Sequence, residues 1–202
     1  MTKTKSSQLW LQRKTKDVYQ KLAKKNQLLS RAAFKLQEID KKFQLINKST
    51  NILDIGCYPG SWLQYLRQYS APYSSIIGID IKNTPKINGI ITIQGNFINR
   101  ITQKKITNKT NQFCDLICSD MCAQATGNKL IDHLKSIDLL NNILAFTYQY
   151  HKPQANLILK MLQGKYSLDF IKKLKHFYIK VSIFKPHSSY KNSREVFIIA
   201  RN

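Results

Sequence analysis

The sequence predicts an α/β protein with a doubly wound, mostly parallel seven-stranded sheet that ends in an antiparallel strand. Three observations support this fold class. Short apolar runs alternate with segments of helical periodicity, and the first of these runs ends in a glycine-bearing turn before a helix. The last two runs are joined by a segment too short for the crossover helix that parallel strands need, so we expect them to form an antiparallel hairpin.

The runs that predict strands are short and rich in Ile, Leu and Val. They cover residues 51–55, 75–80, 90–94, 114–119, 156–160, 180–184 and 195–199. Helices are predicted at residues 31–39, 61–69, 130–150 and 168–177. No element is assigned to the polar, lysine-rich stretch 100–111.

Local signals support two of these helices. Ser30 is the expected N-cap of the first helix. Its apolar face holds Phe34, Leu36 and Ile39. In the long helix, the positions at approximately helical spacing are Leu130, Leu134, Ile137, Asn141 and Leu144. Pro153 is expected to close that section before the fifth strand begins.

Length and charge predict one domain with a basic arm and a polyanionic partner. The 202 residues, 43% of them hydrophobic, are enough for one sizeable core over residues 30–202, preceded by the arm 1–29. The formal net charge of +22 favours a nucleic acid as partner. Trp10 and Tyr19 are interleaved among the basic residues of the arm, as in segments that contact phosphates and stack on bases. A basic drift in composition and a solvated tail without a partner are the alternatives.

The cysteine spacing and the length of the apolar runs indicate whether the protein binds a metal and in which cell compartment it works. Cys57, Cys114, Cys118 and Cys122 form no C-x-x-C pair and have no nearby histidine cluster, so we expect reduced, buried thiols and no metal. No apolar run approaches the roughly 20 residues that span a bilayer. The N-terminus lacks the apolar core of a secretory signal. We therefore expect a cytoplasmic protein without a membrane partner.

The turn after the first strand predicts a site for a nucleoside-containing ligand. Asp54 and Gly56 end the strand, and Gly60 precedes the next helix, where glycines let the backbone approach a ligand. Asp80 ends the second strand, at the position where an acid accepts hydrogen bonds from ribose hydroxyls. A helix N-cap or turn residue is the alternative for Asp80. The spacing matches neither the dinucleotide nor the nucleoside-triphosphate fingerprint, which disfavours both readings.

Four further ionisable residues, Lys35, Asp120, Lys160 and Glu195, lie at the edges of predicted elements. By position alone they are charges at the ends of apolar segments, and strand-end charges in solvent are the alternative for each. Two lysines and two acids that meet in one site are expected to hold one lysine neutral, because a neighbouring cation and burial both lower a lysine pKa.

Five ordered motifs resemble the FtsJ family of RNA 2′-O-ribose methyltransferases. They are Ser30-Arg-Ala-Ala-Phe-Lys-Leu36, Asp54-Ile-Gly-Cys-Tyr-Pro-Gly-Ser-Trp62, Gln94-Gly-Asn-Phe97, Ser119-Asp-Met121 and Ser193-Arg-Glu-Val196. The likeness runs in order from the basic arm almost to the C-terminus. It implies a class I, Rossmann-like methyltransferase fold with S-adenosylmethionine as the donor. The residues it places around the donor are Gly60, Trp62, Asp80, Asn96 and Asp120.

The resemblance also implies roles for the charged residues. Lys160 is the expected base that takes the proton of the ribose hydroxyl. Lys35 supplies positive charge or orients the ribose, Asp120 positions Lys160 and itself lies near the donor methyl, and Glu195 orients Lys35 or the hydroxyl.

The chain departs from the family pattern at several positions. Asn96 stands where an aspartate near the adenine is usual, and its amide oxygen can still accept a hydrogen bond. Ala123 replaces a proline, Ser61 replaces a second glycine, and His187 replaces a residue that is usually acidic.

Basic residues near Glu195 are the candidates for RNA binding. Lys185, Lys191 and Arg194 belong to the segment 185–194 that joins the last two strands. Arg31 is expected either to contact phosphate or to pair with Asp40 or Glu38.

The resemblance implies a monomeric enzyme that methylates the 2′-hydroxyl of a uridine in large-subunit (23S) ribosomal RNA, on the assembled or nearly assembled 50S subunit. The alternatives are a transfer RNA 2′-O-ribose methyltransferase of the same family and a non-catalytic RNA-binding factor for ribosome assembly.

Overall fold

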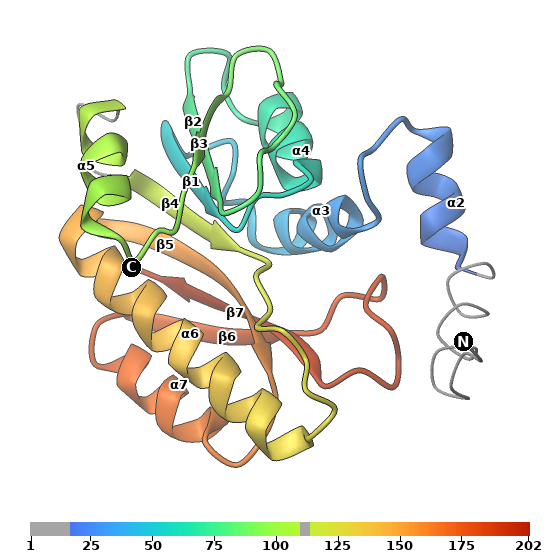
Figure 1. Cartoon of the computed structure of the whole chain (residues 1–202), viewed down its shortest axis with the longest axis vertical. Helices are drawn as coiled ribbons and strands as arrows, with labels where there is room; N and C mark the ends of the chain where they lie inside the picture. Colours follow the sequence, from blue (N-terminus) through green and yellow to red (C-terminus); the bar gives the residue numbers. More distant parts are fainter. Residues whose placement is uncertain (1–16, 110–113) are drawn as a thin grey trace.

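Seven strands form one sheet in the order β3-β2-β1-β4-β5-β7-β6 (Figure 1). The computed structural model describes residues 17–109 and 114–202, without the side chains of residues 107 and 149–154. The strands are β1 (Asn51–Ile55), β2 (Ser75–Asp80), β3 (Ile91–Gln94), β4 (Cys114–Ser119), β5 (His151–Leu162), β6 (Lys180–Phe184) and β7 (Glu195–Arg201). Strands β1 to β5 pair in parallel, whereas β7 is antiparallel to both β5 and β6. The predicted fold class is confirmed.

Helices cover both faces of the sheet. They are α2 (Val18–Lys25), α3 (Ala32–Phe43), α4 (Ser61–Tyr69), α5 (Arg100–Lys109), α6 (Lys129–Tyr150) and α7 (Ser167–Lys175). Buried residues of α3 and α4 form one core with one face of the sheet, and those of α5, α6 and α7 form a second core with the other face. Figure 1 shows α6 and α7 together on one side and α3 with α4 on the other.

Alternation along the strands explains how one sheet serves two cores. In β1, Leu53 and Ile55 face the core with α6, whereas Ile52 faces the core with α3 and α4. Successive side chains of a strand point to opposite faces, so a continuous apolar run supplies both. The chain reverses its strand order between β1 and β4, and ligands of such sheets bind at this point, outside the carboxyl ends of the strands.

Two expectations about helices were wrong. The polar stretch 100–111 contains α5, which is held by the buried side chains of Thr102 and Ile106, one helical turn apart. In α6, Leu130 and Leu134 are exposed, although Leu144 is buried. The buried face of α6 instead begins with two polar residues, His133 and Ser136.

Hydrogen bonds to the end of β5 explain the buried polar face of α6. His133 Nε2 accepts from the Tyr166 N–H at 3.0 Å, and its Nδ1 donates to the Leu162 carbonyl at 2.9 Å. The Ser136 hydroxyl accepts from the Leu162 N–H at 3.3 Å. These bonds remove the penalty for burying polar atoms. The exposed leucines therefore do not mark the buried face.

Some boundaries also differ from those predicted. Strand β5 begins at His151, before Pro153, with a register shift against β4, and β7 continues to Arg201. Helix α3 begins at Ala32, and its N-cap residue is Arg31 instead of the expected Ser30, although the Ser30 hydroxyl accepts from the Ala32 N–H at 3.2 Å. Residues 1–16 of the predicted arm lie outside the described residues. No helix in the described part of the chain is long and apolar enough to cross a membrane.

Candidate active site

A cavity of about 430 Å³ lies at the carboxyl ends of β1 to β4. Residues from four successive strand ends line it, including Gly56, Asp80, Asn96 and Asp120. This is the place that the strand order assigns to a small ligand. A smaller cavity of about 50 Å³ shares Gly56 and Asp120 with the first and is also lined by Asp54 and Trp62.

Glycine is required at the turn after β1. Gly56 has a φ of +80°, and a Cβ added there would lie 1.8 Å from Cγ of Met121. Gly60 has a φ of +109° and is the N-cap residue of α4. Trp62 is buried, and its indole N–H donates to the Ala32 carbonyl at 2.8 Å, which joins α4 to α3. Gly60 thus ends the turn and Trp62 joins two helices, and their contact with a donor stays a prediction.

Asp80 and Asn96 both line the larger cavity. Asp80 accepts from the Tyr58 N–H at 3.0 Å and from the Lys82 N–H at 2.8 Å, so it does order the turn, as its alternative reading expected. Each carboxylate oxygen has two lone pairs, which leaves acceptor capacity for a ligand. The Asn96 side-chain oxygen accepts from the Ile98 N–H at 3.1 Å.

Three carboxylates make this end of the sheet suitable for a cationic ligand. Asp54 is 1% exposed, and among the described residues its Oδ2 atom has no hydrogen-bond partner. Burial, followed by the charges of Asp120 and Asp80, raises the pKa of Asp54 well above its usual value. A positively charged ligand would relieve this repulsion. S-adenosylmethionine, with its sulfonium and amino groups, fits such a donor set.

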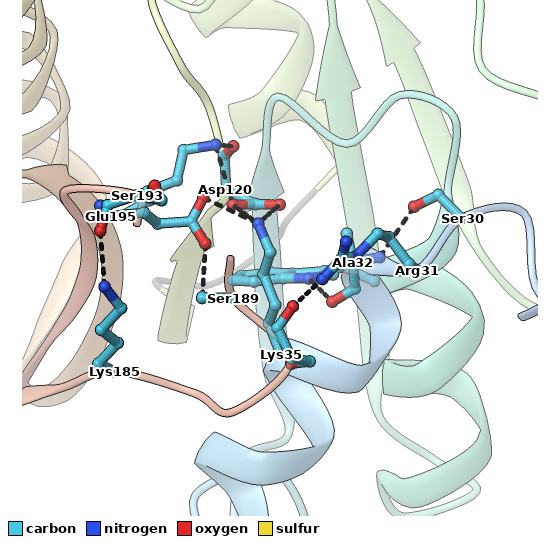
Figure 2. A network of polar contacts seen from close by, with 12 residues as sticks. Ser30, Arg31, Ala32, Lys35, Asp120, Lys185, Ser189, Ser193 and Glu195 are labelled. Carbon is cyan, nitrogen blue, oxygen red and sulfur yellow. Dashed lines mark hydrogen bonds and ion pairs between the residues drawn. The ribbon is translucent and has the colours of Figure 1, made fainter. Parts of the chain in front are cut away.

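All four predicted catalytic residues come together at Asp120. Lys35 Nζ lies 3.4 Å from both carboxylate oxygens of Asp120 and 2.9 Å from Glu195 Oε2. Lys160 Nζ lies 3.0 Å from Asp120 Oδ1 and also donates to the Asp120 backbone carbonyl. Figure 2 shows Lys35 between Asp120 and Glu195. One network therefore joins α3, β5, β7 and the end of β4.

The expectation of a neutral lysine is wrong for Lys160 in this state. Burial lowers its pKa, but the charge of Asp120, then Cys122 and Glu195, raise it, and the net pKa lies above the usual value. Lys35, the expected neighbouring cation, is itself paired with both acids. For Glu195, burial raises the pKa, but the charge of Lys35 and then the hydrogen bond from Ser189 outweigh it, and the net pKa is lowered. The network therefore joins two lysines and two carboxylates through ion-pair contacts.

The expected RNA-binding residues of segment 185–194 are exposed or partly exposed at the protein surface. Lys191 is exposed, and Lys185 is exposed with its Nζ donating to the Ser193 carbonyl at 2.6 Å. Arg194 is partly exposed and donates to the carbonyls of Lys129 and Gln163, each at 3.3 Å. Contact of these residues with RNA stays a prediction.

The expected partners of Arg31 were wrong. Its guanidinium pairs with Asp17 and donates to the Ser188 carbonyl. Asp40 instead accepts backbone N–H groups of the turn after α3. Glu38 accepts from two backbone N–H groups of segment 185–194. The 14% exposure of the Arg31 side chain leaves little of it for a phosphate.

Other features of the site were missed or misjudged from sequence. Ser189 donates its hydroxyl to Glu195 Oε1 at 2.7 Å, and nothing in the motif Ser188-Ser189 distinguishes it from an ordinary loop serine. Cys122 was expected to be buried but is exposed at the cavity, whereas the other three cysteines are buried. The described residues contain no group of three or more His, Cys, Asp or Glu that could hold a metal ion.

The sheet order, the glycine turn and the acidic cavity define a class I methyltransferase fold. The chain belongs to the FtsJ-like methyltransferase family, whose family model matches residues 28–202.

Curated relatives and solved structures agree with this family. The proteins named ribosomal RNA large subunit methyltransferase E include one from Buchnera aphidicola, 37% identical over 98% of this chain and 97% of the relative. The one from Ehrlichia chaffeensis is 36% identical over 96% of this chain and 92% of the relative. A crystal structure described as a ribosomal RNA methyltransferase from Plasmodium falciparum has a TM-score of 0.79 at 35% identity, covering 86% of this chain and 97% of that one.

Proposed function

We propose that this protein methylates the 2′-hydroxyl of a uridine ribose in large-subunit ribosomal RNA, with S-adenosylmethionine as the donor. Its substrate is the assembled or nearly assembled large subunit, on which it acts in the cytoplasm as a monomer. One observation carries the proposal: Lys35, Asp120, Lys160 and Glu195 form one network, and Asp120 also lines the cavity that contains Asp80 and Asn96. The names of the relatives support the choice of RNA.

Residues of the cavity are suited to hold the donor. S-adenosylmethionine supplies an electrophilic methyl group on a positively charged sulfonium. Asp80 and Asn96 offer acceptors for the nucleoside, and Gly56 leaves the backbone of the turn accessible. Asp54 and Asp120 add negative charge that favours a cation.

Lys160 is the proposed base, and it must lose its proton before it acts. Asp120 is the largest influence that raises the pKa of Lys160. Lys160 loses this support when Asp120 is shared with a positively charged ligand, so its pKa falls. Burial then favours the neutral amine, which can accept the proton of a ribose hydroxyl. Lys160 therefore becomes a base only in the loaded site.

The RNA is held by positive charge near Glu195 and by the arm 1–29. Lys185, Lys191 and Arg194 lie on the segment that leads into Glu195. Phosphate contacts of this kind position the substrate without reading its sequence. The assembled subunit then supplies the selectivity, because a small basic domain reads little sequence by itself.

The test is incubation of the purified protein with radiolabelled donor and large subunits from cells that lack the enzyme. We expect label in the ribosomal RNA, and mass mapping should place it on the ribose of one uridine. Transfer RNA from the same cells serves as the competing substrate, and label found only there would replace the ribosomal assignment. Calorimetry with the donor separates the third case, since a lack of donor affinity would indicate a binding protein without catalysis.

A further inference from the structure

One stripe of α3 faces the segment that joins β6 to β7. Arg31 is the N-cap residue and has helical backbone angles, and Lys35 and Glu38 follow it at steps of three to four residues, so the three share one face of the helix. Lys35 reaches Glu195 at the start of β7. The carboxylate of Glu38 accepts from the backbone N–H groups of His187 at 2.6 Å and Ser188 at 2.8 Å. The helix that carries Lys35 therefore also holds the segment that precedes Glu195.

The backbone of Ser188 is fixed on both sides. Its N–H donates to Glu38, and its carbonyl accepts from the Arg31 guanidinium. Arg31 is itself held by Asp17 and stacks 4.1 Å from the ring centroid of Tyr190. These contacts leave the backbone before Ser189 little freedom.

Ser189 closes the ring of contacts. It is 5% exposed, and its hydroxyl donates to Glu195 Oε1 while Oε2 faces Lys35. Figure 2 shows Ser189 and Lys35 on the carboxylate of Glu195. The terminal torsion of a glutamate is broad, so a carboxylate held at only one oxygen can rotate. Two partners on different oxygens restrict this rotation.

We propose that Ser189 is a positioning residue: its hydroxyl orients the Glu195 carboxylate toward Lys35, and Glu38 places Ser189 by holding the two preceding residues. Its effect on turnover rests on the proposed methyl transfer. The orientation of Glu195 itself can be tested without activity.

The charges around Glu195 predict the direction of its titration in a variant. Lys35 from α3 and Lys160 from β5 both lower the pKa of Glu195, and Asp120 faces the same two lysines. The hydrogen bond from Ser189 lowers the pKa further. Removing this hydroxyl leaves both lysines in place. The pKa of Glu195 should therefore rise, although the two lysines still lower it.

The test uses the Ser189→Ala variant of the full chain, with Ser188→Ala as its matched control. The Ser188 hydroxyl is buried and has no hydrogen-bond partner among the described residues, so its removal deletes the same atom from the neighbouring position. Carbon-detected NMR titration of the glutamate carboxyls reports Glu195, whose signal is assigned by its loss in Glu195→Gln. We expect a higher midpoint for Glu195 in Ser189→Ala and an unchanged midpoint in Ser188→Ala.

Turnover provides the second readout. Ser189→Ala should lower kcat about tenfold or more, the loss expected for one hydrogen bond to a charged group. The KM values for donor and RNA should stay nearly unchanged. Glu38→Gln keeps one acceptor of two and should show the same pattern more weakly.

The outcomes separate the two proposals. An unchanged Glu195 titration in Ser189→Ala overturns the positioning role, whether or not the protein is active. Equal titration shifts in Ser189→Ala and Ser188→Ala overturn it as well, because packing alone would then explain both. An unsubstituted protein that methylates no RNA while Glu195 titrates as expected refutes only the proposed function.

Discussion

Lys35 Nζ and Glu195 Oε2 lie 2.9 Å apart although the two residues are 160 positions apart in the sequence. The contact joins α3, near the start of the domain, to β7 at its end. Both side chains are nearly buried, so solvent screens the pair only weakly. The geometry at Asp120 therefore depends on how α3 and β7 pack against the same core.

Lys160→Ala should abolish methyl transfer and leave donor binding nearly intact. Lys160 contacts Asp120 but does not line the donor cavity. Loss of a general base lowers turnover by roughly 10²–10⁴-fold. Single-turnover rates and donor calorimetry measure the two effects separately. Lys48→Ala, which removes an exposed lysine from the turn before β1, is the control for charge. Near-normal turnover in Lys160→Ala would show that the base is assigned wrongly.

Gly56→Ala should lower both stability and donor affinity. At Gly56 the new Cβ would meet the Met121 side chain at 1.8 Å, in a backbone region that is already unfavourable for alanine. Gly127→Ala is the matched control, since Gly127 has a φ of +85° with nothing within 4 Å of an added Cβ. We expect Gly127→Ala to cost about 1–2 kcal/mol through backbone strain alone.

Thermal unfolding and donor calorimetry compare these two glycine variants. For a chain of this size, 1 kcal/mol corresponds to roughly 2–4 °C in Tm. The larger fall in Tm should belong to Gly56→Ala, and only this variant should lose donor affinity. Equal falls in Tm would mean that Met121 moves aside without strain.

Much of the fold was predictable from short apolar runs. The bounds of β1, β2, β4 and β6 match the predicted ones, because burial on both faces requires continuous apolar residues. The hydrophobic periodicity of helix α5 was too weak to predict a helix. Among its described side chains, Thr102 and Ile106 are the buried ones, and most of the others are polar or basic. The buried face of α6 was hidden because it includes polar residues whose partners lie far away in the sequence.

The ionisable residues of the site were predictable from the sequence motifs. The resemblance named Lys35, Asp120, Lys160 and Glu195, and the structure brings them together. The charge state of Lys160 was mispredicted, because it depends on the balance of burial against distances that only the fold provides. The role of Ser189 depends on the position of its backbone, which Glu38 fixes through hydrogen bonds from His187 and Ser188. No local sequence pattern predicts this long-range contact.

Asp54→Asn should stabilise the protein at neutral pH and weaken donor binding. The pKa of Asp54 is raised in the folded state, so the folded carboxyl binds its proton more tightly than the unfolded one. Below the unfolded pKa both states are protonated, and the carboxylate costs nothing. As pH rises above that value and through the folded pKa, burying the charge destabilises the fold.

Tm measured from pH 4 to pH 8 tests this sign. The advantage of Asp54→Asn over the unsubstituted protein should grow as pH rises from 4 to neutrality. Donor affinity should fall, because an amide at position 54 cannot ionise when the cationic donor binds beside Asp80 and Asp120. A Tm difference that is independent of pH would show that the pKa of Asp54 is the same in the folded and unfolded states.

Asn96→Asp should tighten donor binding several-fold. Asn96 lines the cavity beside Asp80, and an ionised acceptor makes hydrogen bonds roughly twice as strong as a neutral one. Asn99→Asp is the control, because Asn99 makes the same kind of turn, accepting from the Ile101 N–H at 2.8 Å, without lining the cavity. Calorimetry should show a gain only at position 96. An equal gain at both positions would indicate a long-range charge effect instead of a contact.

Removal of residues 1–16 should weaken RNA binding and flatten its dependence on salt. The cations lost are Lys3, Lys5, Arg13, Lys14 and Lys16, and this stretch has no acidic residue. Asp17 must be kept, because it caps α2 by accepting from the Tyr19 N–H at 3.0 Å and pairs with Arg31. Each phosphate contact contributes about 0.7–0.9 to the slope of log affinity against log salt.

The slope is measured by RNA binding from 50 to 200 mM salt, and it should fall by up to roughly 4 if all of these cations contact phosphate. The longer deletion of residues 1–29 also removes Asp17 and should lower Tm through the loss of its contacts with Arg31 and Tyr190. The shorter deletion should leave Tm unchanged, since the described contacts of α2 remain. A slope that is the same with and without residues 1–16 would assign phosphate binding to the segment 185–194 alone, because its exposed lysines would then be the remaining cations beside the site.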